Sequence, residues 1–151
     1  MKINKDIIFF QKKKIRKNLV KSKTKIKEIL KILNKTGLRI VYVLDVRSNF
    51  IGTINDGDIR RGFLKGFSLS NTCNSIVNRK SKFIFENHYF SEAMKIINSN
   101  NIEHLPVINS QKKIVGTYLF SNKNIISSNN NVPVVLMAGG KGERLMPLTK
   151  K

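Results

Sequence analysis

The sequence predicts an α/β (α+β) fold built from two copies of one small unit. Residues 39–55, RIVYVLDVRSNFIGTIN, match residues 103–119, EHLPVINSQKKIVGTYL, so that Gly52 aligns with Gly116 at an offset of 64 residues without a gap. In each copy, a segment with helical periodicity precedes two β-rich runs that are separated by a turn. A repeat that keeps its register over this length indicates two copies of one supersecondary unit.

In the first copy the predicted helix carries apolar residues at i, i+3, i+4 and i+7, which is the pattern of one buried face. These residues are Ile26, Ile29, Leu30 and Leu33. Thr24 is the expected N-cap, and Gly37 stands where a left-handed residue would end the helix. Residues 39–44 are predicted to form a strand that is apolar on both faces, residues 50–55 a second strand, and residues 56–65 a short helix.

The second copy repeats this order. SEAMKIINSN, residues 91–100, is the predicted helix, and residues 103–108 and 113–119 are the predicted strands around the turn NSQK. Pro106 favours an edge position or a strand start for the first of these strands. Because a unit of about 60 residues buries only a small core, we expect the two sheets to pack face to face as a pseudo-twofold pair of βαββα units.

The composition is that of a globular protein, with 151 residues of which 40% are hydrophobic. No run approaches the roughly 18 apolar residues that span a bilayer, and the N-terminus lacks the apolar stretch and cleavage site of a signal peptide. We therefore expect a cytoplasmic protein without a membrane partner. Cys73 is the only cysteine, so an internal disulfide or a cysteine metal cluster is excluded. Cys73 is expected to be a packed residue, and no metal site is predicted.

The formal net charge is +20, and much of it lies in residues 1–35, where many lysines stand against only Asp6 and Glu28. Such a charge suits nucleic acid, an anionic membrane or anionic small molecules. Lysine outnumbers arginine, and no aromatic residues are interleaved with the lysines as a stacking platform. No specific nucleic-acid partner is therefore expected, and a polyanion-binding protein with salt-sensitive contacts stays a lesser alternative.

The segment GTINDGDIRR follows the second predicted strand of the first copy and carries several polar groups. Asn55, Asp56 and Asp58 cluster where the strand gives way to a helix, whose N-terminal N–H groups and dipole suit a phosphate. An aspartate beside that phosphate can accept hydrogen bonds from ribose hydroxyls, and Arg60 and Arg61 can contact phosphate. The alternative is that an aspartate here only caps the helix. From this loop alone, capping is the stronger interpretation.

The repeat with VYVLD and FIGTINDGDIR resembles the CBS domain, named after cystathionine β-synthase, over about residues 17–125. The resemblance implies a tandem pair, in which a Gly-x-x-Thr/Ser-x-x-Asp segment contacts the phosphate and ribose of an adenosine nucleotide. Gly52, Asn55 and Asp58 hold those three positions, and Asn55 is a departure from Thr or Ser. The implied nucleotide-binding residues of the first copy are Ile40, Val41, Gly52, Asn55, Asp58 and Arg60.

The second copy departs further from that pattern. Gly116 is kept, but Leu119 takes the Thr/Ser position and Asn122 takes the place of the aspartate. We therefore predict that an adenine nucleotide, AMP, ADP or ATP, binds the cleft of the first copy and not that of the second. His104 is expected to be a packed or surface histidine rather than a ligand, and no other cofactor is expected in this chain.

The C-terminal part begins as a polar linker and then changes character. VPVVLM is a continuous apolar run, as in a buried parallel strand, and AGGKGERL follows it with three glycines. The string MAGGKGERLMPLT resembles the opening strand and loop of sugar-phosphate nucleotidyltransferases, which join a nucleoside triphosphate and a sugar 1-phosphate. By that resemblance the nucleotide-binding residues of this loop are Gly139, Gly140, Lys141, Gly142 and Arg144.

The sequence stops at Lys151, before the active lysine, the carboxylates for Mg²⁺ and the sugar pocket that this resemblance implies. We therefore expect no complete catalytic site and no transferase activity in this chain. The predicted organisation is a basic N-terminal segment (1–16), a first repeat (17–80), a second repeat (81–125), and a linker with a short C-terminal strand-loop stub of the transferase domain (126–151).

The favoured interpretation is a regulatory module that senses adenosine nucleotides, dimerises and belongs to a sugar-1-phosphate nucleotidyltransferase of nucleotide-sugar biosynthesis. Its expected partners are a second copy of the chain, the nucleotide and its own transferase domain. The alternative is a purely structural dimerisation module without a ligand, which the substitutions at Asn55 and Asn122 favour. Nucleotide binding separates these two interpretations.

Overall fold

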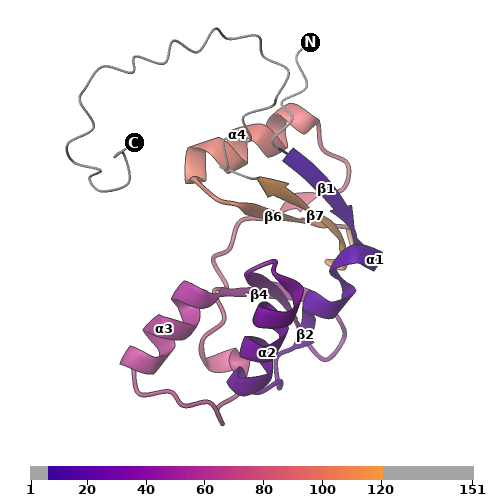
Figure 1. The fold of residues 1–151 in the computed structure, drawn as a ribbon. Coiled ribbons are helices and arrows are strands. Elements are labelled where there is room, and N and C mark those ends of the chain that lie inside the picture. Colours follow the sequence, from indigo (N-terminus) through magenta and orange to yellow (C-terminus); the bar gives the residue numbers. More distant parts are fainter. Residues whose placement is uncertain (1–6, 121–151) are drawn as a thin grey trace, which may run out of the picture.

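The computed structural model describes residues 7–120, which form a mixed α/β fold with two sheets (Figure 1). The elements in chain order are β1 (Ile7–Gln11), α1 (Lys12–Ile15), the 3-10 turn η1 (Arg16–Asn18), β2 (Leu19–Lys21), α2 (Ile26–Thr36), β3 (Ile40–Leu44), β4 (Phe50–Asn55), α3 (Asp56–Leu64), the 3-10 turn η2 (Cys73–Ser75), β5 (Ile84–Phe85), α4 (Phe90–Asn100), β6 (His104–Ile108) and β7 (Ile114–Phe120). The polar linker and the glycine-rich loop lie outside the described residues.

The two halves repeat each other at the spacing found in the sequence. The helices α2 and α4 start at residues 26 and 90, β3 and β6 at 40 and 104, and β4 and β7 at 50 and 114, so each pair is 64 residues apart. The first sheet has the strand order β2-β3-β4, and the second has the order β1-β7-β6-β5. Each repeat joins a short parallel pair to an antiparallel hairpin. The predicted α/β fold is therefore confirmed.

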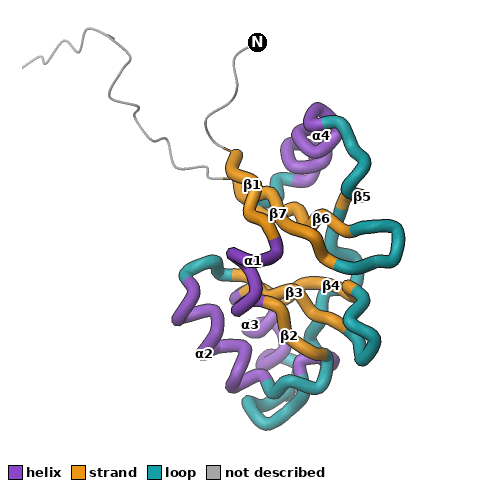
Figure 2. Tube along the Cα trace, turned by 90° about the vertical axis from the view of Figure 1, so that its right-hand side faces the viewer, coloured by secondary structure: helices purple, strands orange, loops and turns teal. Residues whose placement is uncertain are grey.

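The two sheets pack face to face, and Figure 2 shows them as two layers of strands with α2 and α3 beyond one layer and α4 beyond the other. The core between the layers draws residues from both repeats. Its buried members are Ile15, Ile40, Tyr42, Leu44, Phe50, Ile108 and Ile114. Separate clusters pack α2 on the first sheet and α4 on the second. Neither sheet is covered on both faces by its own helices alone, so the pair is needed to bury β3, all of whose residues are buried.

Gly52 and Gly116 occupy equivalent positions, and each makes room for a neighbouring backbone. A Cβ atom on Gly52 would lie 2.4 Å from the carbonyl oxygen of Asn78, and one on Gly116 would lie 2.7 Å from that of Phe10. Asn78 exchanges backbone hydrogen bonds of 3.2 and 2.9 Å with Thr53, whereas Phe10 belongs to β1, which runs antiparallel to β7. Each sheet is thus extended by a segment that precedes the other repeat in the chain.

The ends of α2 test the predicted caps. The helix begins at Ile26, and its N-cap residue is Lys25, which makes no side-chain capping hydrogen bond, so the prediction of Thr24 as N-cap is wrong. Gly37 ends the helix as predicted. Its φ of +69° is left-handed, and its N–H donates to the carbonyl oxygen of Leu33.

Two strands differ from expectation. Pro106 does not lie on an edge strand or at a strand start, because β6 is flanked by β7 and β5. The two-residue β5 pairs only with Val107 and Ile108, so Pro106 precedes the part of β6 that both neighbours contact. The basic N-terminal segment, to which the sequence assigned no element, contributes β1 and α1.

Cys73 is fully buried, as predicted for a packed residue. Its Sγ donates to the carbonyl oxygens of Lys21 and Ser22 at 3.3 and 3.4 Å, and burial raises the pKa of its thiol to about 11. A thiol with so high a pKa is a weak nucleophile at neutral pH. Within the described residues, no helix has the length and apolar character needed to cross a membrane.

Candidate functional site: a cleft between the repeats

A cavity of about 470 Å³ lies between the two repeats, where β3 starts and β4 ends. One wall belongs to the first repeat and the other to the connection between α4 and β6 of the second. The lining residues are Arg39, Ile40, Thr53, Asn55, Asp56, Gly57, Arg61, Asn78, Ser81, Lys82, Asn101, Ile102, Glu103 and His104. Its volume lies in the range of small-molecule sites.

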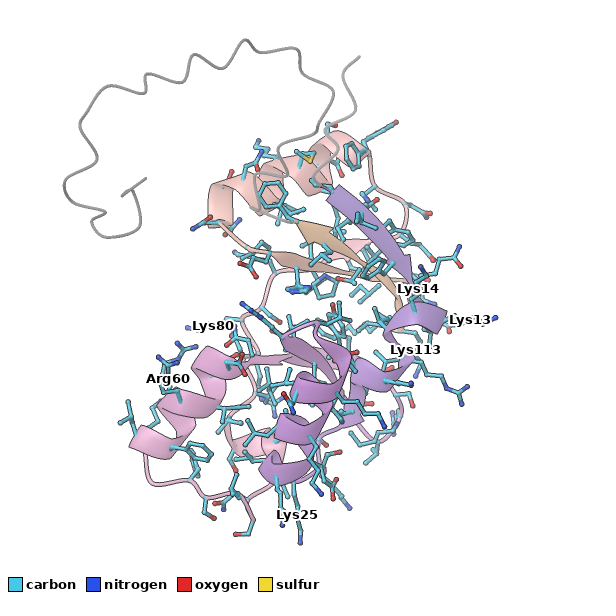
Figure 3. All side chains as sticks on the ribbon, viewed as in Figure 1. Lys13, Lys14, Lys25, Arg60, Lys80 and Lys113 are labelled. Atoms are coloured by element: carbon cyan, nitrogen blue, oxygen red, sulfur yellow. The ribbon has the colours of Figure 1, made fainter. Side chains whose placement is uncertain are left out.

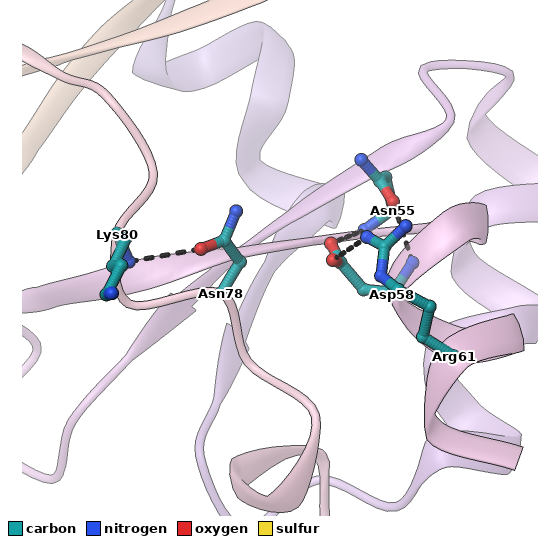
Figure 4. A network of polar contacts seen from close by, with 5 residues as sticks. All are labelled: Asn55, Asp58, Arg61, Asn78 and Lys80. Atoms are coloured by element: carbon teal, nitrogen blue, oxygen red, sulfur yellow. Dashed lines mark hydrogen bonds and ion pairs between the residues drawn. The ribbon is translucent and has the colours of Figure 1, made fainter. Parts of the chain in front are cut away.

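The loop at the start of α3 forms a closed set of polar contacts (Figure 4). The Oδ1 atom of Asn55 accepts from the backbone N–H of Asp58 at 2.9 Å, and the backbone N–H of Asn55 donates to Oδ2 of Asp58 at 3.0 Å. This is a reciprocal capping box. The remaining oxygen of Asp58, Oδ1, accepts from Nη2 of Arg61 at 2.6 Å. Both carboxylate oxygens of Asp58 therefore have partners within the chain.

The residues implied by the sequence separate into two groups. Ile40 and Asn55 line the cavity. The side chain of Val41 is fully buried in the core of the first repeat, and Gly52 is buried where the backbone of Asn78 passes over it. Neither of these two lines the cavity.

Asp58 and Arg60 also lie away from the cavity lining. Asp58 is 8% exposed, and it forms hydrogen bonds with Asn55 and Arg61, both of which line the cavity. Arg60 is exposed and does not line it, whereas the adjacent Arg61 does. The three-residue spacing from Asp58 to Arg61 was a signal for this contact, because residues i and i+3 are neighbours on a helix.

The charges around the cavity are mixed, with basic groups in excess. Arg39, Arg61 and Lys82 face Asp56 and Glu103. The α3 helix begins at Asp56, so its N-terminal N–H groups lie at the same wall. Partial positive charge from a helix N-terminus and nearby guanidinium groups favours an anion such as phosphate.

The second repeat contributes polar atoms that lack partners. The Nδ1 atom of His104 and the Oγ atom of Ser81 are buried without a hydrogen-bond partner among the described residues. Burial lowers the pKa of His104 from its ordinary value of 6.5, and Glu103 opposes that shift. An unpaired buried polar atom is costly, and both of these residues also line the cavity. His104 is therefore packed, as expected, but it also lines the cavity.

The second-repeat wall was missed from sequence. Residues 101–104 line the cavity although no loop motif marks them. The offset of 64 residues was the available signal, since it pairs residues 103–104 with residues 39–40 of the opposite wall. Leu119 is half-buried on β7, Gly116 is covered by β1, and Asn122 lies outside the described residues. The nucleotide loop of Gly139, Gly140, Lys141, Gly142 and Arg144 also lies outside them.

Comparison with known proteins gives a family match over both repeats. A family model described as CBS domain matches residues 14–65 and 73–118, which together make up more than half of the chain. The chain is also similar to an uncharacterised protein, RP505, of Rickettsia prowazekii (strain Madrid E), with 32% identity over 90 residues. That match covers 60% of this chain and 28% of the relative, so the chain spans little more than a quarter of the length of the curated relative it matches.

Solved structures share the fold at low identity. The CBS domains of a transcriptional regulator from Streptococcus pneumoniae have a TM-score of 0.59 and 14% identity, covering 68% of this chain and 83% of that one. CBSX2 in complex with AMP has a TM-score of 0.57 and 16% identity, covering 68% and 79%. The cytosolic domain of the Mg²⁺ channel MgtE in complex with ATP has a TM-score of 0.56 and 18% identity, covering 68% and 41%.

Proposed function

Because the chain belongs to the CBS domain family, we propose that it is a regulatory module that binds an adenine nucleotide between its two repeats. The observation that carries this proposal is the 470 Å³ cavity between the repeats, which is lined by three basic side chains, by the first residues of a helix, and by His104 and Ser81 of the opposite wall. CBSX2 and MgtE, which share the fold, are described as complexes with AMP and ATP. These relatives support an adenine nucleotide as the first ligand to test.

The residue roles follow from the positions of the lining groups. The apolar side chains of Ile40 and Ile102, on opposite walls, flank the base, and Arg61 and Lys82 hold the phosphates. Asn55 donates from its amide at the position where the family pattern has a hydroxyl. Asp58 positions Asn55 and Arg61, and it reaches the ribose only if Arg61 leaves it for the phosphate. Val41 and Gly52 support the strands, and Arg60 contributes no contact.

The regulatory step is a shift in population. A nucleotide in this cavity touches both repeats, so it favours the arrangement in which both walls contact it. The shift cannot exceed the difference in its affinity for the two arrangements. This proposal includes no catalytic step.

Calorimetric titration of the chain with AMP, ADP and ATP tests the site. We expect one nucleotide per chain, and we expect Arg61→Gln to weaken binding by about tenfold or more, because it removes a charge-assisted contact. Arg60→Gln is the matched control, since it removes the same charge from the same helix outside the cavity. Absence of binding at millimolar nucleotide would reject the proposal in favour of a purely structural module.

We also propose a homodimer. Phe63 and Leu64 at the end of α3 are 41% and 84% exposed, and Leu69, which follows them, is 45% exposed. Large apolar side chains exposed close together in the sequence favour a protein contact. Light scattering after size exclusion should give twice the 17.3 kDa chain mass, and Leu64→Lys should yield monomer. Val46→Lys, at a residue 74% exposed in the β3–β4 turn, is the control that should stay dimeric.

The link to a sugar-1-phosphate nucleotidyltransferase is a proposal that rests on MAGGKGERLMPLT alone. Under it, the module passes its nucleotide-dependent arrangement through the linker to a following transferase domain, which alone would require Mg²⁺. An assay of this chain with nucleoside triphosphates and sugar 1-phosphates should give no pyrophosphate. Production of pyrophosphate above the level of a Gly140→Val, Arg144→Ala control would contradict that expectation.

A further inference from the structure

A second hollow lies at the opposite end of β3 from the nucleotide cleft. It has a volume of about 750 Å³ and is bounded by α1, η1, β2 and the β3–β4 turn. Four cationic side chains line it, from Lys12, Lys13, Arg16 and Lys21, and no acidic side chain does. Figure 3 shows Lys13, Lys14 and Lys113 gathered around α1, on the side of the molecule away from Lys80 and Arg60.

These cations have no anionic partners in the described part of the chain. Among residues 7–120 the one ion pair joins Arg61, which lines the nucleotide cleft, to Asp58. Lys21 is instead held by oxygen atoms of the turn, with its Nζ donating to the carbonyl oxygen of Asp45 at 3.1 Å and to Oγ of Ser48 at 2.6 Å. Like charges that converge without counter-charges raise the local potential and attract an anion.

The floor of this hollow is apolar. Leu19 is half-buried, and Leu44 and Ile114 are 9% and 2% exposed. Because Leu44 and Ile114 are almost fully buried while the four cations are exposed, we expect a group that enters the hollow to reach these apolar side chains and the flat surface of a bilayer not to. No aromatic side chain lines the hollow, so the stacking that single-stranded nucleic acid uses is missing there.

From the ring of cations and the recessed apolar floor, we propose that this hollow binds a small soluble phosphate ester whose organic group is apolar. The phosphate lies between Lys12, Lys13, Arg16 and Lys21, and the organic group lies on Leu19, Leu44 and Ile114. This ligand differs in kind from the nucleotide of the cleft. The two sites share no lining residue, so either can exist without the other.

Hexyl phosphate and inorganic phosphate are the probes, titrated into the whole chain by calorimetry. Hexyl phosphate should bind more tightly than inorganic phosphate by about tenfold or more, because its chain buries apolar surface on the floor. The triple variant Lys12→Ser, Lys13→Ser, Arg16→Ser should weaken hexyl phosphate by about tenfold or more. The matched triple Lys27→Ser, Lys31→Ser, Lys35→Ser removes the same charge from the exposed side of α2 and should retain the affinity.

A second variant, Ser48→Asp, tests the same site independently in case the first triple variant does not fold. Ser48 has a φ of +64°, a conformation that aspartate tolerates better than most residues, so Ser48→Asp should fold and should weaken hexyl phosphate by placing a carboxylate beside Lys21. Equal losses in the two triple variants would show that net charge alone is measured and would overturn the proposal. Equal affinity for inorganic and hexyl phosphate would overturn it too, as would binding only to vesicles that contain phosphatidylglycerol.

Discussion

The two hollows of this molecule lie at opposite ends of the same strand and differ in chemistry. The cleft at Ile40 mixes basic and acidic groups and contains polar atoms without partners, whereas the hollow at Leu44 joins four cations to an apolar floor. The sequence repeat predicts the strands that border both hollows, because it indicates where each strand starts and ends. The side chains that line the two hollows differ, so the shared backbone arrangement does not determine which ligand binds in each.

The largest expected effects on stability come from substitution of the two equivalent glycines, Gly52 and Gly116, because each substitution should disturb one hollow and leave the other intact. Gly52→Val should push away Asn78, a lining residue of the cleft, and Gly116→Val should push away β1, which leads into α1 at the other hollow. Each should cost about 3 kcal/mol of unfolding free energy, as overpacking does. Urea unfolding measures this, and each variant should lose the ligand of its own hollow while keeping the other.

The control for these variants is Gly37→Ala. Gly37 is left-handed, but a Cβ atom there meets nothing within 4 Å, so the cost should be only about 1 kcal/mol. Equal costs for Gly37→Ala and Gly52→Val would show that backbone conformation, and not the passage of a neighbouring backbone, determines the effect.

Asp58→Ala should have the next largest effect. It removes the capping box and the partner of Arg61, and it should cost about 1–2 kcal/mol, mostly from the cap, because the arginine is largely exposed. Asp56→Ala removes a carboxylate from the same first turn without a capping contact and should cost about 0.5 kcal/mol or less. Both are measured by urea unfolding, and equal losses would reject the cap as the role of Asp58.

Protonation of His104, which lines the cleft, should have a smaller effect on the stability of the fold. Burial lowers the pKa of His104, so the folded protein binds its proton less readily than the unfolded chain does. The stability that comes from keeping His104 neutral is fully present at pH values above its ordinary pKa of 6.5, and it is lost as the pH falls through the pKa of the folded state. The Tm of the wild type should therefore fall more than that of His104→Gln between about pH 7.5 and pH 5. Parallel pH profiles would contradict this.

The smallest expected effect is a change in the rate at which the thiol of Cys73 is labelled, which should respond to a ligand in either hollow. Its buried thiol, with a pKa of about 11, should react with an aromatic disulfide reagent at pH 8 only when the structure opens. Saturating AMP and saturating hexyl phosphate should each slow that reaction. Fast labelling of the native protein, at the rate of a small free thiol, would show that the first repeat is not packed as described.

The elements predicted from the sequence are those with a strong pattern of their own, and the elements that were missed are short or depend on a distant partner. Periodicity located α2, β3, β4 and α4 because each has a strong pattern of its own. It did not locate β1, which is a short run of four apolar residues without periodicity and whose partner, β7, is more than a hundred residues away. The three-residue β2 and two-residue β5 are too short to give a pattern.

The cleft shows the same limit at the level of single residues. The loop motif identified Asn55, which lines the cavity, and Asp58, which holds it. It selected Arg60, whereas Arg61 lines the cavity, because that choice depends on where α3 starts and on which face the helix turns to the cavity. His104 and Ser81 could not be predicted from a motif, since they reach the cavity only through the packing of one repeat on the other.

The place of β1 has a consequence for synthesis on the ribosome. This strand is made before every other strand of the described residues, yet its only partner in the described sheet is β7, which ends at Phe120. The first sheet, by contrast, has all its strands and the Asn78 bridge by residue 78. The nascent chain therefore holds Ile8 and Phe9, both of which stay exposed even in the finished fold, without their partner strand until β7 has emerged.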